Sequence, residues 1–354
     1  MDERTEAPTV PVYTATALQV RVKCVNRCPD RASARARMMQ TLAHVAEKVR
    51  GVKRWMGPNC RLVVLPEYFL TSFPQDEPIA AWADKAALAP DGPEYEAMGR
   101  IAQDNDVYLA GNAYELDRHF PGLYFQTCFV VAPDGTVILR YRRLNSMFAP
   151  TPHDVWDKYL DIYGLDAVFP VADTPIGRLA PIASEEILYP EIARCFAMRG
   201  AEVFLHSSSE NGSIEPTPKD IAKRARAIEN MAYVVSANTG GLDDIDLTED
   251  SANGCSRVID YQGNVMRIAG WGETANASAQ LDINVLRRER RKPGMSNYLS
   301  RQRNEVFVHA YAAHVHQPAN GLLDANGEVR SVPRSHFAEA QRRTIQSLID
   351  KGVI

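Results

Sequence analysis

The sequence has few of the features that mark secreted, membrane-spanning or disordered proteins. Its 354 residues contain six cysteines, too few for a disulfide framework in a chain of this length. No apolar run approaches the roughly 20 residues that a membrane-spanning helix needs. The first residues, Met1-Asp-Glu-Arg-Thr-Glu6, are acidic and lack the basic and then apolar pattern of a secretory signal. These absences predict a reduced, cytoplasmic protein that makes no contact with a membrane.

The chain also lacks a large excess of charge of either sign. It carries 40 Lys and Arg against 44 Asp and Glu, a net charge of −4, which argues against nucleic acid as a partner. Hydrophobic residues make up 45% and charged residues 24%, as in ordinary globular proteins. The sequence shows no internal repeat and no low-complexity linker, so we expect one large domain.

Segments with strand and helix patterns alternate along the chain, and hairpins recur among them. We expect strands over residues 15–24, 61–65, 107–111, 127–132, 136–141, 179–183, 203–206, 231–237, 257–260 and 265–268, and helices over residues 31–52, 95–105, 188–199, 220–230 and 335–351. The segments Pro133-Asp-Gly135 and Tyr261-Gln-Gly-Asn264 are typical hairpin turns. This mixture predicts an α/β layered sandwich with mixed sheets rather than a parallel barrel.

Polar residues that could carry chemistry follow three of the expected strands. Glu67 comes directly after a buried strand that Pro66 ends, and the stretch Arg140-Tyr-Arg-Arg-Leu144 ends the strand after the Pro-Asp-Gly turn. The stretch Ser184-Glu-Glu186 lies where a strand meets the next helix, and backbone N–H groups point toward a side chain at such an elbow. These three strand ends are where we expect the residues that carry chemistry.

Several blocks, in order, resemble the nitrilase superfamily of carbon–nitrogen hydrolases. They are Leu62-Val-Val-Leu-Pro-Glu-Tyr-Phe69, Asp134-Gly135 with Arg140-Tyr-Arg-Arg-Leu144, Tyr189-Pro-Glu-Ile-Ala-Arg194, Arg199-Gly-Ala-Glu-Val203, Ala225-Arg-Ala-Ile-Glu-Asn230 and Gly254-Cys-Ser-Arg-Val-Ile-Asp260. The resemblance covers roughly residues 15–290. It implies a four-layer α-β-β-α sandwich over residues 12–296, followed by a C-terminal extension over residues 297–354, and a homodimer or a higher homo-oligomer.

The resemblance also implies a catalytic site, from which this sequence departs. Family members use a Glu–Lys–Cys triad, usually with a second Glu between the Lys and the Cys. The general-base position is Glu67, the Lys position is Arg143, and the Cys position, six residues before Pro190, is Ser184. No Glu lies between Arg143 and Ser184, and the nearest substitutes are Asp154 and Asp157.

These departures weaken the usual chemistry. A thiol with a pKa near 8.5 is readily ionised, whereas a serine hydroxyl is far less acidic and usually needs an oriented histidine. The nearest histidines in the sequence are His153 and His206, and the sequence does not show whether either reaches Ser184. Arg143 keeps a positive charge but cannot release its proton, and its planar fork suits carboxylates.

Three functions therefore remain open. The first is a hydrolase acting on a small amide, nitrile or carbamoyl compound, with Glu67 as acid and base and with Ser184 or a water as nucleophile. The second is a binding or partner protein that has lost catalysis. The third is a non-covalent acid–base enzyme, such as a lyase or dehydratase, that uses Glu67 and Arg143. The candidate residues for binding a small-molecule substrate are Tyr68, Asp154, Glu185 and Tyr189.

No cofactor or metal is expected from the sequence. Cys24 and Cys28 have no partner pair for zinc, and His314-Val-His316 has no third ligand in view. The segment Gly270-Trp-Gly-Glu-Thr-Ala275 resembles a dinucleotide loop, but a strand follows it where such loops open a helix.

Overall fold

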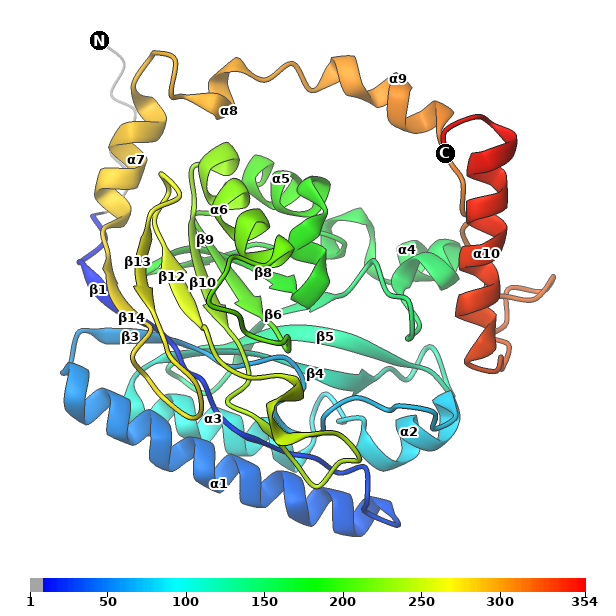
Figure 1. Ribbon diagram of the computed structural model, residues 1–354, viewed down its shortest axis with the longest axis horizontal. Helices are drawn as coiled ribbons and strands as arrows, with labels where there is room; N and C mark the ends of the chain where they lie inside the picture. The colour runs from blue at the N-terminus through cyan, green and yellow to red at the C-terminus, as the bar shows by residue number, and fades with distance from the viewer. Residues whose placement is uncertain (1–8) are drawn as a thin grey trace.

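The computed structural model describes residues 9–354, and the acidic stretch Met1–Glu6 lies outside this part of the chain. Two six-stranded sheets form its centre (Figure 1). No helix among the described residues is long and apolar enough to cross a membrane.

The first sheet has the strand order β14-β1-β3-β4-β5-β6. Its strands are β1 (Tyr13–Ala17), β3 (Cys60–Val64), β4 (Tyr108–Leu116), β5 (Tyr124–Val131), β6 (Val137–Arg142) and β14 (Ser278–Leu281). β1, β3 and β4 are parallel, and β5, β6 and β14 each pair antiparallel with a neighbour. The ends of β3 and β6 therefore lie at the same edge of the sheet.

The second sheet repeats this plan, with the order β13-β12-β10-β9-β8-β7. Its strands are β7 (Ala172–Thr174), β8 (Gly177–Ala183), β9 (Val203–Ser207), β10 (Tyr233–Ala237), β12 (Arg257–Ile259) and β13 (Val265–Ile268). Three central parallel strands, β8, β9 and β10, again have antiparallel neighbours. A separate small sheet pairs β2 (Val22–Lys23) with β11 (Leu242–Asp243).

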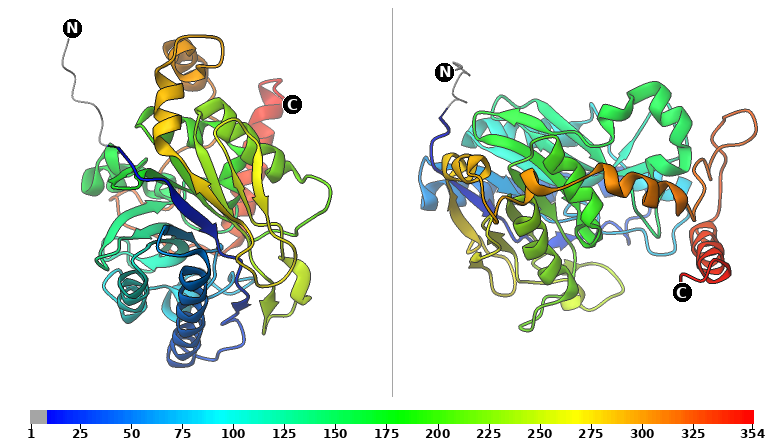
Figure 2. Two further views of the ribbon diagram at one scale, coloured as in Figure 1. Left: turned by 90° about the vertical axis from the view of Figure 1, so that its left-hand side faces the viewer. Right: turned by 90° about the horizontal axis from the view of Figure 1, so that it is seen from above.

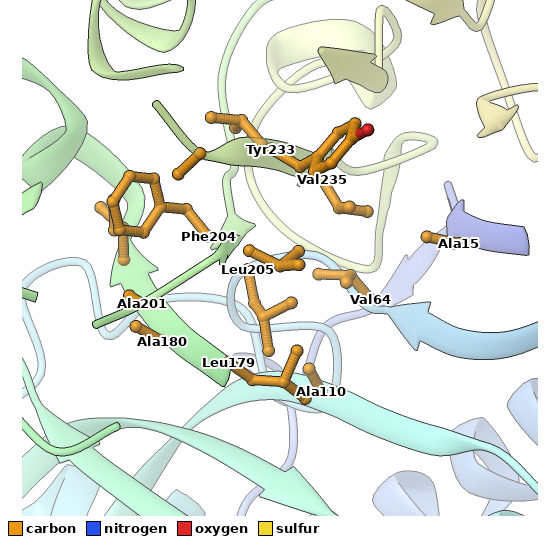
Figure 3. Packing of buried hydrophobic residues seen from close by; sticks show 14 of the residues in the cluster. Ala15, Val64, Ala110, Leu179, Ala180, Ala201, Phe204, Leu205, Tyr233 and Val235 are labelled. Carbon is orange, nitrogen blue, oxygen red and sulfur yellow. The ribbon is translucent and has the colours of Figure 1, made fainter. Parts of the chain in front are cut away.

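Helices cover the outer face of each sheet and complete four layers. α1 (Arg31–Met56), α2 (Ile79–Ala86) and α3 (Pro93–Asn105) cover the first sheet, and α5 (Pro190–Met198) and α6 (Pro218–Asn230) cover the second (Figure 1). Between the sheets, Val64 and Ala110 of the first sheet face Leu179 and Leu205 of the second (Figure 3). The expected four-layer α-β-β-α sandwich is confirmed.

Shorter elements connect these layers. They are α4 (Trp156–Tyr163), α7 (Ile283–Arg291) and the 3₁₀ helices η1 (Pro152–Val155), η2 (Leu165–Ala167), η3 (Ser184–Leu188) and η4 (Glu249–Ser251). η3 matters most for function, because it begins at Ser184. The helix expected from residue 188 begins at Pro190, after this tight turn. The single strand expected over residues 15–24 is wrong. The Gln19 side chain bonds the carbonyl groups of Gly270 and Gly272, and the chain leaves the sheet there.

The C-terminal segment contains α8 (Tyr298–Arg301), α9 (Glu305–Ala313) and α10 (Ser335–Asp350). It arches outside α5 and α6 before α10 turns back beside α4 (Figures 1 and 2). The Tyr311 hydroxyl donates to Glu191 of α5 at 2.6 Å, and Phe337 of α10 is buried against the core. This segment therefore contacts the sandwich through α9 and α10.

Candidate active site

The ends of β3, β6 and β8 bring Glu67, Arg143 and Ser184 together. Each residue follows its strand directly or within three positions, and the two sheets face each other at this edge (Figure 1). Two hydrogen bonds join the sheets there, from the Ser207 hydroxyl to the Leu65 carbonyl at 2.8 Å and from the Glu67 N–H to the Ser208 carbonyl at 3.2 Å. The site thus lies where both halves of the sandwich meet.

Glu67 is a buried carboxyl group with several partners. Its Oε1 accepts a hydrogen bond from Gln126 Nε2 at 2.6 Å and lies 3.5 Å from a guanidinium nitrogen of Arg143. Burial raises the pKa of Glu67, whereas the charges of Arg143 and Lys219 and the polar side chains of Ser184 and Gln126 act in the opposite direction. Burial has the largest effect, so Glu67 holds a proton more readily than an exposed glutamate does.

Gln126, on β5, connects Glu67 with Arg143 and was not among the residues expected from the sequence. Its Oε1 accepts from Arg143 at 2.8 Å and from the Tyr68 hydroxyl at 3.4 Å, while its Nε2 donates to Glu67. Tyr68 also stacks on Tyr114, with ring centroids 5.2 Å apart. Gln126 and Tyr68 therefore hold Glu67 and Arg143 in a fixed arrangement.

Arg143 is buried, and its hydrogen bonds are directed at three groups. Nη1 donates to Gln126, Nη2 to the Glu185 carboxylate, and Nε to the Asn145 carbonyl at 2.6 Å. Among residues 9–354, Arg143 forms no hydrogen bond with Ser184. One nitrogen of its guanidinium binds a carboxylate of the protein itself, that of Glu185.

Ser184 is the first residue of η3 and is nearly buried. Its backbone has a φ of 46°, a left-handed conformation that costs free energy for a residue with a side chain. His206 Nε2 lies 2.8 Å from the Ser184 carbonyl oxygen, and its Nδ1 lies 2.7 Å from the Ser236 hydroxyl. Since a carbonyl only accepts, Nε2 carries the proton. His206 therefore positions the Ser184 backbone and does not contact the hydroxyl.

Lys219 is a second cation at the site. It is the second residue of α6, and its Nζ lies 3.3 Å from the Ser184 Oγ. Its charge also opposes protonation of both Glu67 and Glu210. Lys219 was not expected from the sequence, because the helix was expected to begin at residue 220. The sequence did contain one signal. A lysine in the first turn of a helix is unfavourable beside the positive end of the helix dipole, so its presence there indicates a role other than helix stability.

Glu186, also missed, is fully buried and supports the loop after Arg143. Its Oε1 accepts from the N–H groups of Leu144 and Asn145 at 2.8 and 2.9 Å, and its Oε2 accepts from the Tyr141 hydroxyl at 2.7 Å. Burial raises the pKa of Glu186, and the charge of Arg143 opposes that rise. Glu186 thereby fixes the position from which Arg143 extends.

The two aspartates considered as substitutes for the second glutamate are engaged in local contacts. Asp154 Oδ2 accepts from both the N–H and the hydroxyl of Thr151 at 2.8 Å, which caps η1. Asp157 accepts from the Asn320 side chain at 2.8 Å. Among residues 9–354, neither aspartate forms a hydrogen bond with Glu67.

A cavity of about 580 Å³ adjoins this site between the sandwich and α10. Glu185, Tyr189 and Asp154 line it, and so do Phe337 and Gln341 of α10. Three of the four expected substrate-binding residues therefore face one cavity, while Tyr68 lies next to Glu67. The Arg143–Glu185 ion pair connects the cavity wall to Glu67.

The sequence model of the carbon–nitrogen hydrolase family matches residues 21–291. The omega-amidase NIT2-B of Xenopus laevis is 24% identical over 235 residues, covering 66% of this chain and 81% of that protein. The omega-amidase NIT2 of Mus musculus is 25% identical over 216 residues, covering 61% and 75%.

Solved structures share the fold. Nit3 of Saccharomyces cerevisiae, a member of branch 10 of the nitrilase superfamily, has a TM-score of 0.61 at 21% identity and covers 81% of this chain and 96% of its own. A carbon–nitrogen hydrolase from Helicobacter pylori has a TM-score of 0.63 at 20% identity, covering 86% and 100%. With the family match over most of its length, the chain belongs to the carbon–nitrogen hydrolase family of the nitrilase superfamily.

Proposed function

We propose that this protein hydrolyses the C–N bond of a small amide, with Ser184 as the nucleophile and Glu67 as the general base. The observation that carries the proposal is the meeting of Ser184 and the buried Glu67 carboxyl group at adjoining strand ends, where the Lys219 ammonium lies 3.3 Å from the Ser184 hydroxyl and its charge also acts on Glu67. A nucleophile and a base within hydrogen-bonding reach are the minimum that acyl transfer requires. The names of the omega-amidase relatives point to the same reaction class.

The reaction has two halves. The Ser184 oxygen bonds to the amide carbon as its proton passes to Glu67, and the carbonyl electron pair moves onto the oxygen. The tetrahedral intermediate collapses, the C–N bond breaks, and Glu67 returns the proton to the leaving nitrogen as ammonia or an amine. A water then attacks the ester with Glu67 again as the base, which releases the acid and restores the serine.

Burial of Glu67 supports both of its roles. A carboxyl group with a raised pKa is a stronger base when ionised than an exposed carboxylate. It also stays protonated at a pH closer to neutral, so that it has a proton to give to the leaving group. Glu67 can therefore accept and return the same proton within one cycle.

The adjoining cavity supports a small substrate. Its volume suits a compact molecule, and its lining combines the aromatic rings of Trp156, Phe169 and Phe337 with the carboxylate of Glu185. Because Glu185 already neutralises Arg143, a carboxylate-bearing substrate would have to displace Glu185. We therefore favour a substrate whose reacting end is a neutral amide.

The experiment is an assay for ammonia with a panel of small amides, nitriles and carbamoyl compounds. We expect release from at least one amide and its loss in Glu67→Gln and Ser184→Ala. If ammonia is still released by Ser184→Ala but not by Glu67→Gln, water is the nucleophile. No release from any compound by the wild-type protein would contradict the proposal and favour a binding function.

A further inference from the structure

The position that carries the lysine in related enzymes does not supply a cation to Ser184 here. Arg143 occupies it, and the hydrogen bonds of its three nitrogens go to Gln126, Glu185 and Asn145 rather than to Ser184. Its charge acts on Glu67, at 3.5 Å, and is balanced by Glu185. A developing negative charge on the serine oxygen therefore needs another source of stabilisation.

Lys219 has the geometry for this role. Its ammonium group is 3.3 Å from the Ser184 Oγ, within hydrogen-bonding distance. Among residues 9–354, no carboxylate lies within 4.0 Å of Lys219. The ammonium group of Lys219 can therefore act on the serine oxygen, whereas the neighbouring Lys223 forms ion pairs with Glu210 and Asp220.

The contact between Lys219 and Ser184 is fixed by the packing of α6 on η3. From α6, Arg226 donates to the carbonyl groups of Ile187 and Leu188, at 2.9 and 3.0 Å. The first turn of α6 is held by the Thr217–Asp220 capping box, and Asp220 is bound in turn by Arg257 at 3.0 Å. Both ends of the contact therefore belong to firmly held backbone.

The location of Lys219 opposes the intrinsic preference of a helix. The N-terminal turn of α6 carries a partial positive charge, which favours an acidic residue and disfavours a lysine. A residue that breaks a local rule of this kind is expected at functional positions, where another requirement outweighs stability.

We propose that Lys219 is the catalytic cation of this site, and that it stabilises the serine oxygen as Glu67 removes its proton. The Ser184 O–H bond breaks and its proton goes to Glu67. The electron pair stays on the serine oxygen, which is hydrogen-bonded to Lys219, and then forms the new bond to carbon. Glu67, Lys219 and Ser184 then form the catalytic unit. Arg143 is a positioning residue that acts through Gln126 and Glu185. The inference rests on the proposed function, because it assigns a nucleophilic role to Ser184.

The test uses a fluorophosphonate probe, which measures serine reactivity without any amide substrate. The Ser184 oxygen forms a bond to phosphorus, the P–F bond breaks, fluoride leaves, and the hydroxyl proton goes to Glu67. Labelling rates are compared for the wild-type protein, Lys219→Met, Lys219→Gln and Lys219→Arg, with peptide mapping to identify the labelled residue. Lys292→Met is the matched control, because Lys292 is exposed directly after α7 and, among residues 9–354, forms an ion pair only with Glu289.

We expect the wild-type protein to be labelled at Ser184 and both neutral Lys219 variants to react about 100-fold more slowly, as when a donor to an oxyanion is removed. Lys219→Arg should react faster than the neutral variants, and Lys292→Met should match the wild type. Thermal unfolding midpoints within a few degrees of the wild type would show that the variants are folded. Two neutral variants are used so that the test remains possible if one of them does not fold.

Two outcomes would overturn the inference. One is labelling of folded Lys219→Met or Lys219→Gln at the wild-type rate, and the other is failure of the wild-type protein to react at Ser184. If the wild-type protein is unlabelled but releases ammonia from an amide, the proposed hydrolysis stands with water as nucleophile. If labelling depends on Lys219 but no amide is cleaved, the inference stands and the proposed function fails.

Discussion

His206 contacts the backbone of Ser184 and not its hydroxyl, with Nε2 placed 2.8 Å from the carbonyl oxygen. A histidine close to a candidate nucleophile would ordinarily be assigned as its base. Here burial, and secondarily the charge of Lys223, lower the pKa of His206 well below its usual value of about 6.5, so the ring stays neutral. His206 is a structural support for the left-handed backbone at Ser184.

This burial predicts a pH-dependent stability. Below about pH 6.5 the unfolded chain binds a proton on His206 and the folded chain does not, so the free energy of unfolding falls as the pH decreases. From pH 7 to pH 5.5 we expect His206 to account for a loss of about 1 kcal/mol. Urea unfolding at both pH values measures it.

His206→Gln is the control for that measurement. The variant should be less stable at pH 7 but should lack the histidine-dependent loss between the two pH values. Glu67 and Glu186 have raised pKa values and act with the opposite sign, since their protonated folded forms lose stability as the pH rises. Because both carboxyl groups remain in the variant, the difference between the proteins isolates His206. Equal pH dependence would contradict a buried neutral ring.

The raised pKa of Glu67 predicts the acid side of the rate profile. Glu67 must be ionised to accept the serine proton, so kcat/KM should rise with pH through a value above that of an ordinary glutamate, about 4.3. Glu67→Gln should reduce the rate by about 100-fold or more and remove this limb. Glu67→Asp should keep the limb at a lower rate. A limb at the ordinary glutamate pKa would show that Glu67 is not the titrating base.

Ser184→Cys should create a reactive thiol. A sulfur at this position would lie beside the Lys219 ammonium, which favours the thiolate, and it would regain the residue type used by relatives. We expect iodoacetamide at pH 7 to alkylate this residue about tenfold faster than the native cysteines. Burial raises the pKa of Cys24 to about 11 and that of Cys128 to about 12, and those thiols should stay unreacted. Peptide mapping by mass spectrometry identifies the product, and preferential alkylation elsewhere would contradict the prediction.

Phe337→Ala should alter substrate binding more than chemistry. Phe337 is the largest side chain that α10 contributes to the cavity wall and is 7% exposed. We expect a higher KM with little change in kcat, together with a loss of up to about 3 kcal/mol in the free energy of unfolding. Ile345→Ala, on the same helix but 42% exposed, is the control and should change neither KM nor stability appreciably. A fall in kcat with an unchanged KM would place α10 in the chemical step.

Much of the fold could be predicted because strand and helix periods are local properties of the sequence. The strand ending before Pro66 and the hairpin at Asp134-Gly135 are examples, and both were found where expected. The bends at Gln19 and Ser184 could not be predicted, because each depends on hydrogen bonds to residues distant in sequence, such as Gly270 and His206.

The residues of the candidate site could likewise be predicted only in part. Strand ends and family register pointed to Glu67, Arg143 and Ser184, which the structure brings close together. Gln126 was missed because nothing in its local sequence shows which way its side chain points between the sheets, and Lys219 was missed because the helix that carries it was expected to begin one residue later. Asp154 was a candidate only by elimination, and its capping contact with Thr151 is the ordinary role of an aspartate at a helix start.

The contact between Arg143 and Glu185 links two events at different places in the molecule. Glu185 borders the cavity, while its partner Arg143 faces the buried carboxyl group of Glu67. A positively charged molecule that drew Glu185 toward itself would leave the guanidinium less neutralised and so make Glu67 easier to deprotonate. Binding of such a molecule in the cavity would then lower the pKa of Glu67 through the Arg143–Glu185 ion pair, without a direct contact between its positive charge and Glu67.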